Sequence, residues 1–353
     1  MMRAAGTISA QRGAVISVLD SGNVHACTFS LGRSVTAGVG GLVRAATDPK
    51  SGGTSASVHA CTFFDVTPFA LHKSTLEEGT QMPKLIAITN PKGGTGKSTT
   101  TAALAALAAR DGYRTLLIDL DPQQTVSFLS RGEWETDADT AAAMFLQSNA
   151  TVPSALARPT IYGYDLVPAG AVLADAEDQL RLDPFGSTRL RKLFKRDESL
   201  TRYDVVFIDT SANKTRMLTS TLMAATHVLI PMQASNVTMK DLSELLPIID
   251  GINEQRGDFG EPPLVNYGIL FTMVKDGTRA NEAVIAALSE QLLGLPGVPV
   301  SPVRIPHSVA VEDAALARAP VTVARPGENV AKRYVQFWDS ISGREAVVQA
   351  VAV

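Results

Sequence analysis

Eight consecutive residues combine glycines, two lysines and hydroxyl side chains in a spacing that suits phosphate binding. They are Lys92, Gly93, Gly94, Thr95, Gly96, Lys97, Ser98 and Thr99. Glycines let backbone N–H groups converge on phosphate oxygens, where a Cβ would crowd the ligand. We expect Lys97 to reach the β- and γ-phosphates of a nucleotide and the Ser98 hydroxyl to ligate Mg²⁺. The sequence therefore predicts a P-loop.

Three aspartates follow apolar runs further along the chain. Asp119 and Asp121 come after the run at 115–118, and Asp209 comes after the run at 205–208. If these runs are parallel strands, their carboxyl ends lie at the same edge of the sheet as the P-loop. Asp209 matches a Walker B aspartate, which holds Mg²⁺ directly or through water. For Asp119 or Asp121, a helix-capping role is the alternative.

The segments around these residues predict the elements that position them. Residues 85–89 form a short β-branched run that fits a buried strand, and an Ala/Leu-rich helix is expected from about 99 to 110. From residue 82 onward, strand-like runs alternate with helix-like stretches. This alternation predicts an α/β fold of the P-loop NTPase kind, with a doubly wound, mostly parallel sheet and helices on both faces.

The composition limits the class of protein. With 45% apolar and 19% charged residues, the 353-residue chain fits a globular protein with a sizeable core. No apolar run approaches the ~18–20 residues that span a bilayer, and we see no secretory signal. Only Cys27 and Cys61 occur, so a reducing cytoplasm is expected rather than a disulfide framework. A net charge of −3 means that any DNA contact must come from a local patch.

Residues 1–81 differ from the rest, being rich in small residues with few charges and no sustained period. We expect this part to be a mostly disordered extension, or upstream DNA translated from a start codon placed too early. The six-residue sequence Val24–Phe29 recurs as Val58–Phe63. It could supply zinc ligands, dock a peptide, or reflect a duplicated DNA palindrome. Met82 is the natural alternative start of an ATPase domain spanning residues 82–353.

Pro91 stands where the ordinary P-loop pattern has glycine, and Lys92 follows it directly. This resembles the deviant Walker motif of the ParA/MinD ATPases, a likeness that extends across roughly residues 83–342. The resemblance implies ATP and Mg²⁺ as cofactors and a dimer that sandwiches ATP, in which Lys92 reaches the partner's phosphates. It also implies that Asp121 orients the attacking water and that Asp119 lies near the water shell of the metal. Ser211 and Ala212 depart from the two prolines usual in the family, which puts switch II in doubt.

The same resemblance implies a partition ATPase. Its ATP-bound homodimer would bind DNA non-specifically on the nucleoid, and a ParB-like centromere-binding partner would trigger ATP hydrolysis. Basic clusters suggest the DNA surface, although each equally fits a solvated helix face. They comprise Arg189, Arg191, Lys192, Lys195 and Arg196, followed by Lys332 and Arg333. The nature of the cargo, whether plasmid, chromosome or protein cluster, stays open.

Related functions are less well supported by the residues. A MinD-like regulator of a membrane or protein-cluster cargo would need a basic amphipathic C-terminal helix, but Arg344 is the only basic residue after 341. Instead, Val330, Tyr334, Phe337, Trp338 and Ile341 predict a stripe that faces the core. A nitrogenase-like reductase needs cluster-binding cysteines, and residues 82–353 contain none. We recognise neither the substrate residues of a dethiobiotin-synthetase-like ligase nor an N-terminal helix-turn-helix. His227 and His307 are expected to be structural.

Overall fold

The computed structural model describes residues 82–342 apart from six short gaps, together with four strands nearer the N-terminus. The gaps are 132–139, 147–150, 213–214, 234–237, 276–278 and 294–297. The chain divides into two compact units, Met1–Ala70 and Leu71–Val353, and each is described by itself.

The first unit contains two antiparallel strand pairs. Strand β1 (Val15–Asp20) pairs with β2 (Asn23–Thr28), and β3 (Val35–Ala37) pairs with β4 (Val43–Ala45). The sequence analysis did not predict these pairs, because it found no sustained period in residues 1–81. The first copy of the repeated sequence lies largely on β2, whereas the second copy lies outside the described residues. The disorder expected for the rest of this segment also lies outside them.

Seven strands of the second unit form one sheet, in the order β11-β10-β5-β9-β6-β8-β7. They are β5 (Lys84–Ile88), β6 (Thr115–Leu120), β7 (Arg158–Pro159), β8 (Asp165–Val167), β9 (Val205–Thr210), β10 (His227–Gln233) and β11 (Val265–Thr272). All neighbouring strands pair in parallel except β7 and β8. This confirms the predicted α/β fold. The antiparallel edge was not predicted, because a two-residue strand leaves no pattern.

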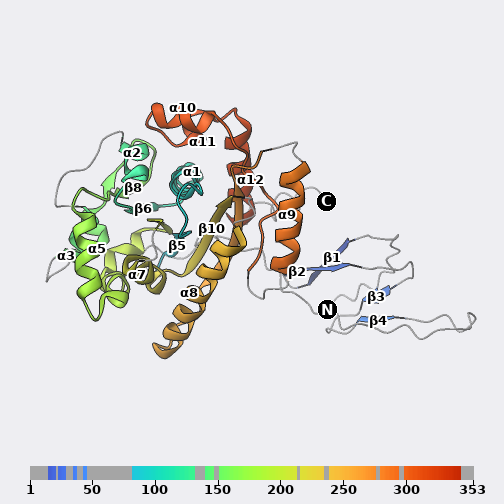
Figure 1. Ribbon diagram of the computed structural model, residues 1–353, viewed down its shortest axis with the longest axis horizontal. Helices are drawn as coiled ribbons and strands as arrows, with labels where there is room; N and C mark the ends of the chain where they lie inside the picture. The colour runs from blue at the N-terminus through green and yellow to red at the C-terminus, as the bar shows by residue number, and fades with distance from the viewer. Residues whose placement is uncertain are drawn as a thin grey trace, which may run out of the picture. The chain divides into compact units, whose positions relative to one another are not determined.

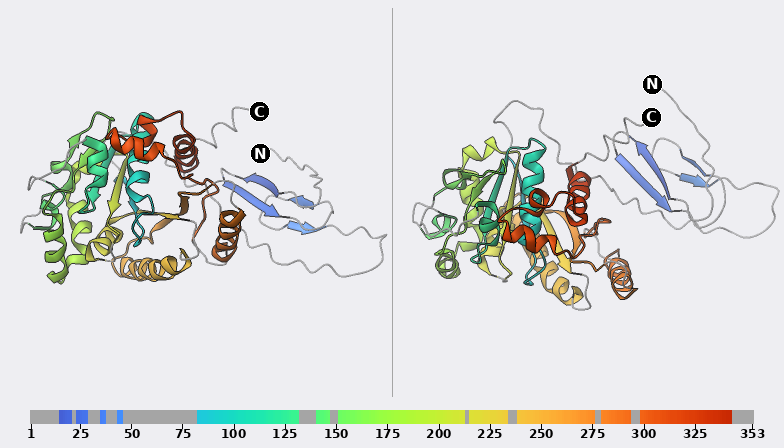
Figure 2. Two further views of the ribbon diagram at one scale, coloured as in Figure 1. Left: turned by 45° about the horizontal axis from the view of Figure 1, so that its top comes forward. Right: turned by 90° about the horizontal axis from the view of Figure 1, so that it is seen from above.

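Helices cover both faces of this sheet, as the views in Figures 1 and 2 show. On β5, Ile86 and Ile88 pack into the cluster with α1 and α12, whereas Leu85 and Ala87 point to the opposite face. The first face carries α1 (Lys97–Arg110), α2 (Thr125–Arg131), α10 (Ala310–Leu316), α11 (Val321–Ala324) and α12 (Asn329–Ser342). The opposite side carries α3 (Ala143–Leu146), α4 (Pro153–Leu156), α5 (Leu173–Leu182), α6 (Arg189–Arg196), α7 (Arg216–Ala224), α8 (Thr238–Asp258) and α9 (Arg279–Leu293).

Helix α1 lies in the core rather than on the surface. Every residue from Thr100 to Ala108 is buried, and most of these are alanines. A helix that is apolar all round is one that packs on all sides. Here the sheet lies on one side and α11 and α12 lie on the other. The N-terminus of α1, with the loop before it, is therefore fixed by core packing.

The predicted stripe on the last described helix is confirmed. Val330, Tyr334, Phe337, Trp338 and Ile341 of α12 are all buried. Trp338 makes an edge-to-face contact with Tyr113, at a centroid distance of 5.5 Å, and its Nε1 donates to Asp111. In the part of the chain that the structure describes, no helix is both long and apolar enough to cross a membrane.

Candidate nucleotide site

The glycine loop lies between the end of β5 and the start of α1, as the sequence predicts. Gly94 and Gly96 have φ angles of 70° and 77°, in the left-handed region that glycine adopts without strain. A Cβ built on Gly94 would have nothing within 4 Å, so the loop backbone borders open space there. The amides of this loop and the N-terminus of α1 thus lie beside open space that suits an anion.

Side chains from the neighbouring strands hold the loop in place. Thr272, at the end of β11, donates from Oγ1 to the carbonyl oxygen of Thr95 at 2.8 Å. Gln233, at the end of β10, donates from Nε2 to the carbonyl oxygen of Gly94 at 2.6 Å. Asn90 donates to the carbonyl oxygen of Pro231 at 2.9 Å. Thr272, Gln233 and Pro231 lie far from the loop in sequence, and the sequence pattern did not reveal these contacts.

The ammonium of Lys97 is turned back onto its own loop. Its Nζ lies 3.1 Å from the carbonyl oxygen of Lys92, and the residue is only 6% exposed. Burial lowers the pKa of Lys97, while the charges of Asp209 and Asp121 oppose that shift. A phosphate bound in the loop would replace the carbonyl as the partner of this ammonium. Its negative charge would offset the free-energy cost of burying the ammonium.

The ammonium of Lys92 pairs with a residue from a distant helix. Its Nζ is 3.3 Å from Oδ2 of Asp241, which lies in the first turn of α8. The two side chains are 33% and 17% exposed. The backbone N–H of Lys92 is held by Oδ1 of Asn90 at 3.0 Å. The sequence pattern did not single out Asp241.

Asp209, at the end of β9, is fully buried and held by two hydroxyl groups of α1. Ser98 donates to one carboxylate oxygen at 2.7 Å, and Thr101 donates to the other at 2.9 Å. Burial and the neighbouring charge of Asp119 raise the pKa of Asp209 to about 8, although both hydrogen bonds lower it. Thr101 lies one helical turn after Lys97, a spacing that could have identified it.

Asp119 lies opposite Asp209 on the adjacent strand β6 and is also fully buried. Its Oδ2 accepts hydrogen bonds from the backbone N–H of Ser127 at 2.9 Å and from the Ser127 hydroxyl at 2.6 Å. Ser127 lies in the first turn of α2, so the carboxylate satisfies an N-terminal donor of that helix. The capping alternative therefore fits Asp119. Burial raises the pKa of Asp119 to about 6 against these hydrogen bonds.

Asp121 lies just beyond β6, on the turn that leads to α2. Its Oδ1 accepts a hydrogen bond from the backbone N–H of Gln123 at 2.9 Å, and its own N–H donates to Asp119. Its charge acts on both Lys97 and Asp209. The structure thus brings the three predicted aspartates and Lys97 together at one edge of the sheet. Switch II is near as well, since a Cβ on Gly93 would lie 3.9 Å from the side chain of Ala212.

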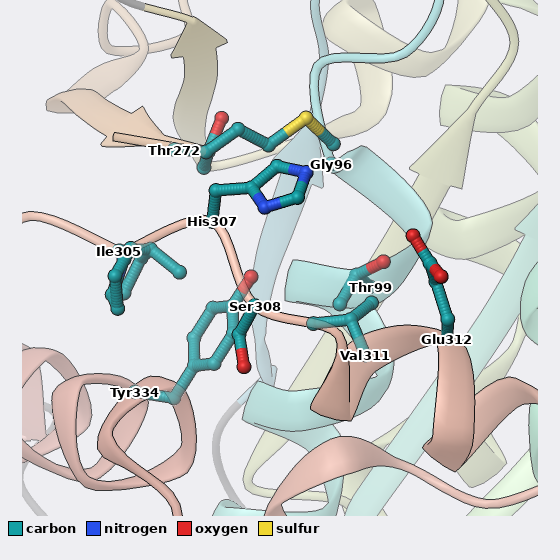
Figure 3. Close-up of a pocket in the computed structure, with 11 residues that line it drawn as sticks. Gly96, Thr99, Thr272, Ile305, His307, Ser308, Val311, Glu312 and Tyr334 are labelled. Carbon is teal, nitrogen blue, oxygen red and sulfur yellow. The ribbon is translucent and has the colours of Figure 1, made fainter. Parts of the chain in front are cut away.

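A pocket of about 160 Å³ opens beside the end of the loop (Figure 3). In Figure 3, His307 lies next to Gly96, while Tyr334 and Ile305 line the side opposite Thr99 and Glu312. The hydroxyl of Tyr334 is 3.1 Å from that of Thr100. The pocket is lined by Gly96, Thr99, Thr272, Met273, Ile305, Pro306, His307, Ser308, Val311, Glu312 and Tyr334. The two predicted structural histidines therefore differ, because His307 lines the pocket and His227 stacks on Tyr267 at the start of β10.

The Ser98 hydroxyl and the Asp209 carboxylate fit a magnesium ion. Mg²⁺ prefers oxygen ligands and usually takes one or two protein groups, with phosphates and water completing its shell. A cation here would favour the ionised form of Asp209, which burial disfavours. Among the described residues, no group of three or more His, Cys, Asp or Glu side chains could hold a metal.

The raised pKa of Asp209 leads to a testable pH dependence of stability. Without nucleotide or Mg²⁺, an unfolded aspartate loses its proton near pH 4, whereas folded Asp209 keeps its proton up to about pH 8. The free energy of unfolding should therefore fall as pH rises from 6.5 to 8, by up to ~1.4 kcal/mol per pH unit. Urea denaturation in EDTA measures this slope. Asp209→Asn should flatten it, while Asp250→Asn, at an exposed site on α8, should not. An unchanged slope in Asp209→Asn would contradict the assignment.

Comparison with known proteins places this site in a family context. Residues 83–259 match the model of a protein family described as an AAA domain. The chain is 28% identical over 256 residues to the sporulation initiation inhibitor protein Soj of Bacillus subtilis, which covers 72% of this chain and 97% of Soj. It is 29% identical over 269 residues to the chromosome partitioning protein ParA of Caulobacter vibrioides, which covers 76% of this chain and 97% of that protein. A solved structure of cobyrinic acid a,c-diamide synthase from Mycobacterium smegmatis, with a bound ATP analogue and magnesium, matches with a TM-score of 0.59 at 26% identity, covering 73% of this chain and 93% of that one.

Proposed function

The chain belongs to the ParA/MinD family of P-loop ATPases, and we propose that it is a partition ATPase whose ATP-bound dimer binds DNA and hydrolyses ATP when a ParB-like partner stimulates it. The observation that carries the proposal is the additional lysine of the loop, Lys92. Lys92 keeps a third of its side chain exposed, unlike the buried Lys97. A lysine placed there can reach a phosphate outside its own chain. The name of one relative, the chromosome partitioning protein ParA, adds support for partition as the process.

Within one chain, the loop holds the nucleotide. The amides of residues 93–97 would bind the phosphates, and Lys97 would neutralise part of their charge. The pocket beside Gly96 and Thr99 would take the base and ribose, with Glu312 as a hydrogen-bond acceptor. Ser98 and Asp209 would hold Mg²⁺, which supplies charge stabilisation for phosphoryl transfer. Thr101 fixes the rotation of the Asp209 carboxylate, and Asp119 holds the turn that carries Asp121.

Hydrolysis requires an oriented water and compensation of the charge that develops on the phosphates. We assign the first task to Asp121, whose partly exposed carboxylate lies beside Lys97 at the open edge of the site. We assign the second to Lys97, together with Lys92 of the other chain in the dimer. Because Lys92 comes from the other chain, the fully assembled site depends on dimerisation. Slow hydrolysis by the chain alone follows from this arrangement.

The predicted DNA surface on α6 carries less free charge than its sequence suggests. Arg191 and Lys195 both pair with Glu261, at 2.7 and 2.6 Å, and Arg189 pairs with Asp183. Lys332 and Arg333, at the start of α12, are exposed. We therefore place the DNA contact on the α12 pair, with Lys192 of α6 as a secondary candidate.

One experiment tests the dimer and the DNA contact together. In the wild-type chain, ATP should produce dimers in light scattering and retention on arbitrary duplex DNA, with binding that falls steeply as salt rises. Lys92→Ala should keep ATP affinity within about threefold, since exposed ion pairs contribute little to binding, yet lose both dimers and DNA retention. The physical reason is that the phosphates of each chain would lack the cation supplied by the other.

Lys240→Ala is the matched control, because Lys240 is an exposed lysine on α8 that takes no part in the proposed site. It should dimerise like the wild type. Normal dimerisation of Lys92→Ala would contradict the partition assignment. Dimers that form with ATP but do not bind DNA would instead favour an orphan ATPase that positions a protein cluster or acts at a membrane.

A further inference from the structure

The contact between Lys92 and Asp241 involves the lysine on which the proposed dimer depends. It joins the loop to α8 across 149 positions of sequence, with 3.3 Å between Nζ and Oδ2. Both groups belong to the same chain. The inference drawn from it rests on the proposed function, because it concerns how dimerisation is controlled.

Asp241 is suited to hold a cation. It lies in the first turn of α8, where the helix dipole favours a negative charge whether or not a lysine is near. Only 17% of its side chain is exposed, so little water competes for the carboxylate. Lys92 is restrained at its other end as well, because Oδ1 of Asn90 holds its backbone N–H. The flexible part of this arrangement is the Lys92 side chain.

The ammonium of Lys92 cannot serve two distant anions at once. To reach the phosphates of another chain it must leave Asp241, whose carboxylate keeps the favourable field of α8 after the lysine has moved. We propose that Asp241 is a positioning residue that holds Lys92 within its own chain, and so raises the ATP and protein concentration at which dimers form. A symmetric dimer breaks this contact twice, so its effect on the dimer dissociation constant is squared.

The test is the dissociation constant of the ATP-bound dimer, measured by analytical ultracentrifugation on the full chain. Asp241→Asn keeps the shape of the side chain and removes its charge. Its dimer dissociation constant should be about tenfold lower than that of the wild type. Each partly exposed ion pair changes this constant about threefold, and dimerisation breaks two of them. Asp241→Glu keeps the charge and should restore a dissociation constant near the wild-type value. Asp250→Asn, on an exposed position of the same helix, controls for the loss of a carboxylate from α8.

Two further readouts separate positioning from a purely structural role. At concentrations where the chain is monomeric, the affinity for a fluorescent ATP analogue should be the same in wild type and Asp241→Asn. Raising the salt concentration should bring the dimer dissociation constants of wild type and Asp241→Asn closer together, because salt screens the Lys92–Asp241 pair.

The outcomes are distinct. If the wild-type chain does not dimerise with ATP, the proposed function itself fails. If the wild type dimerises and Asp241→Asn has the same or a weaker dimer affinity, only the role of Asp241 is overturned. If Asp250→Asn strengthens the dimer as much as Asp241→Asn does, the effect belongs to the net charge of α8, and the proposal is likewise overturned.

Discussion

Lys97→Ala is expected to lower the affinity for ATP about a thousandfold, the scale of about 4 kcal/mol lost when one partner of a buried charge pair is removed. The bound phosphates would then lose the ammonium that offsets their charge beside Asp209 and Asp121. The same substitution should not lower the melting temperature of the chain measured without ATP, because burial already disfavours the charged form of Lys97. Isothermal titration calorimetry and differential scanning calorimetry measure the two quantities.

This combination of outcomes separates a binding role from a structural one. If Lys97 served mainly to stabilise the fold, replacing it would lower the melting temperature. Here only the affinity for ATP should fall. Lys240→Ala again serves as the control and should leave both quantities unchanged. ATP binding that survives Lys97→Ala would contradict the placement of the phosphates in this loop.

Asp121→Ala is expected to reduce ATP hydrolysis by about a hundredfold or more, the contribution of a positioned general base. It should at the same time increase the lifetime of the ATP-bound dimer, because the dimer would lose its means of removing the γ-phosphate. Phosphate release under single-turnover conditions measures the first effect, and sedimentation after the removal of free ATP measures the second.

Asp121 also accepts a hydrogen bond from the backbone N–H of Gln123, so the alanine variant changes the turn as well as the chemistry. Asp121→Asn keeps an acceptor at that position and removes only the charge. If the carboxylate acts on water, both variants should trap the dimer. Hydrolysis at the wild-type rate in Asp121→Asn would show that the turn, and not the carboxylate, is what matters.

The sequence predicted the elements whose signal is local. The strands at 84–88, 115–120 and 205–210 follow from short apolar runs, and the helix after the P-loop follows from its alanines and leucines. Their order was sufficient for the parallel sheet and for the edge where Asp119, Asp121 and Asp209 meet. β7 has two residues and leaves no pattern, and the strand pairs near the N-terminus lie in a segment with no sustained period, so neither was predicted.

The partners of the site residues could not be predicted in the same way. Lys92 meets Asp241, and Thr95 meets Thr272, across distances in sequence that only the folded sheet closes. No spacing rule connects such pairs. Thr101 could have been identified from its spacing of one helical turn from Lys97, whereas a hydroxyl group in a first turn, such as that of Ser127, is too common to be informative. The elements and their order could thus be read from one sequence, whereas the contacts that tune the site required the fold.

The buried alanines of α1 tie the ATP site to the mutational tolerance of the core. Ala102, Ala103 and Ala105 are 0% exposed, so a larger side chain at any of them must push the helix away from the sheet or from α12. Such overpacking costs about 1–3 kcal/mol in stability. It would also move Lys97 and Ser98, which begin the same rigid helix. Sequence drift at these positions is thus constrained twice, by packing and by catalysis, and a library that varies α1 should recover few active variants with larger residues there.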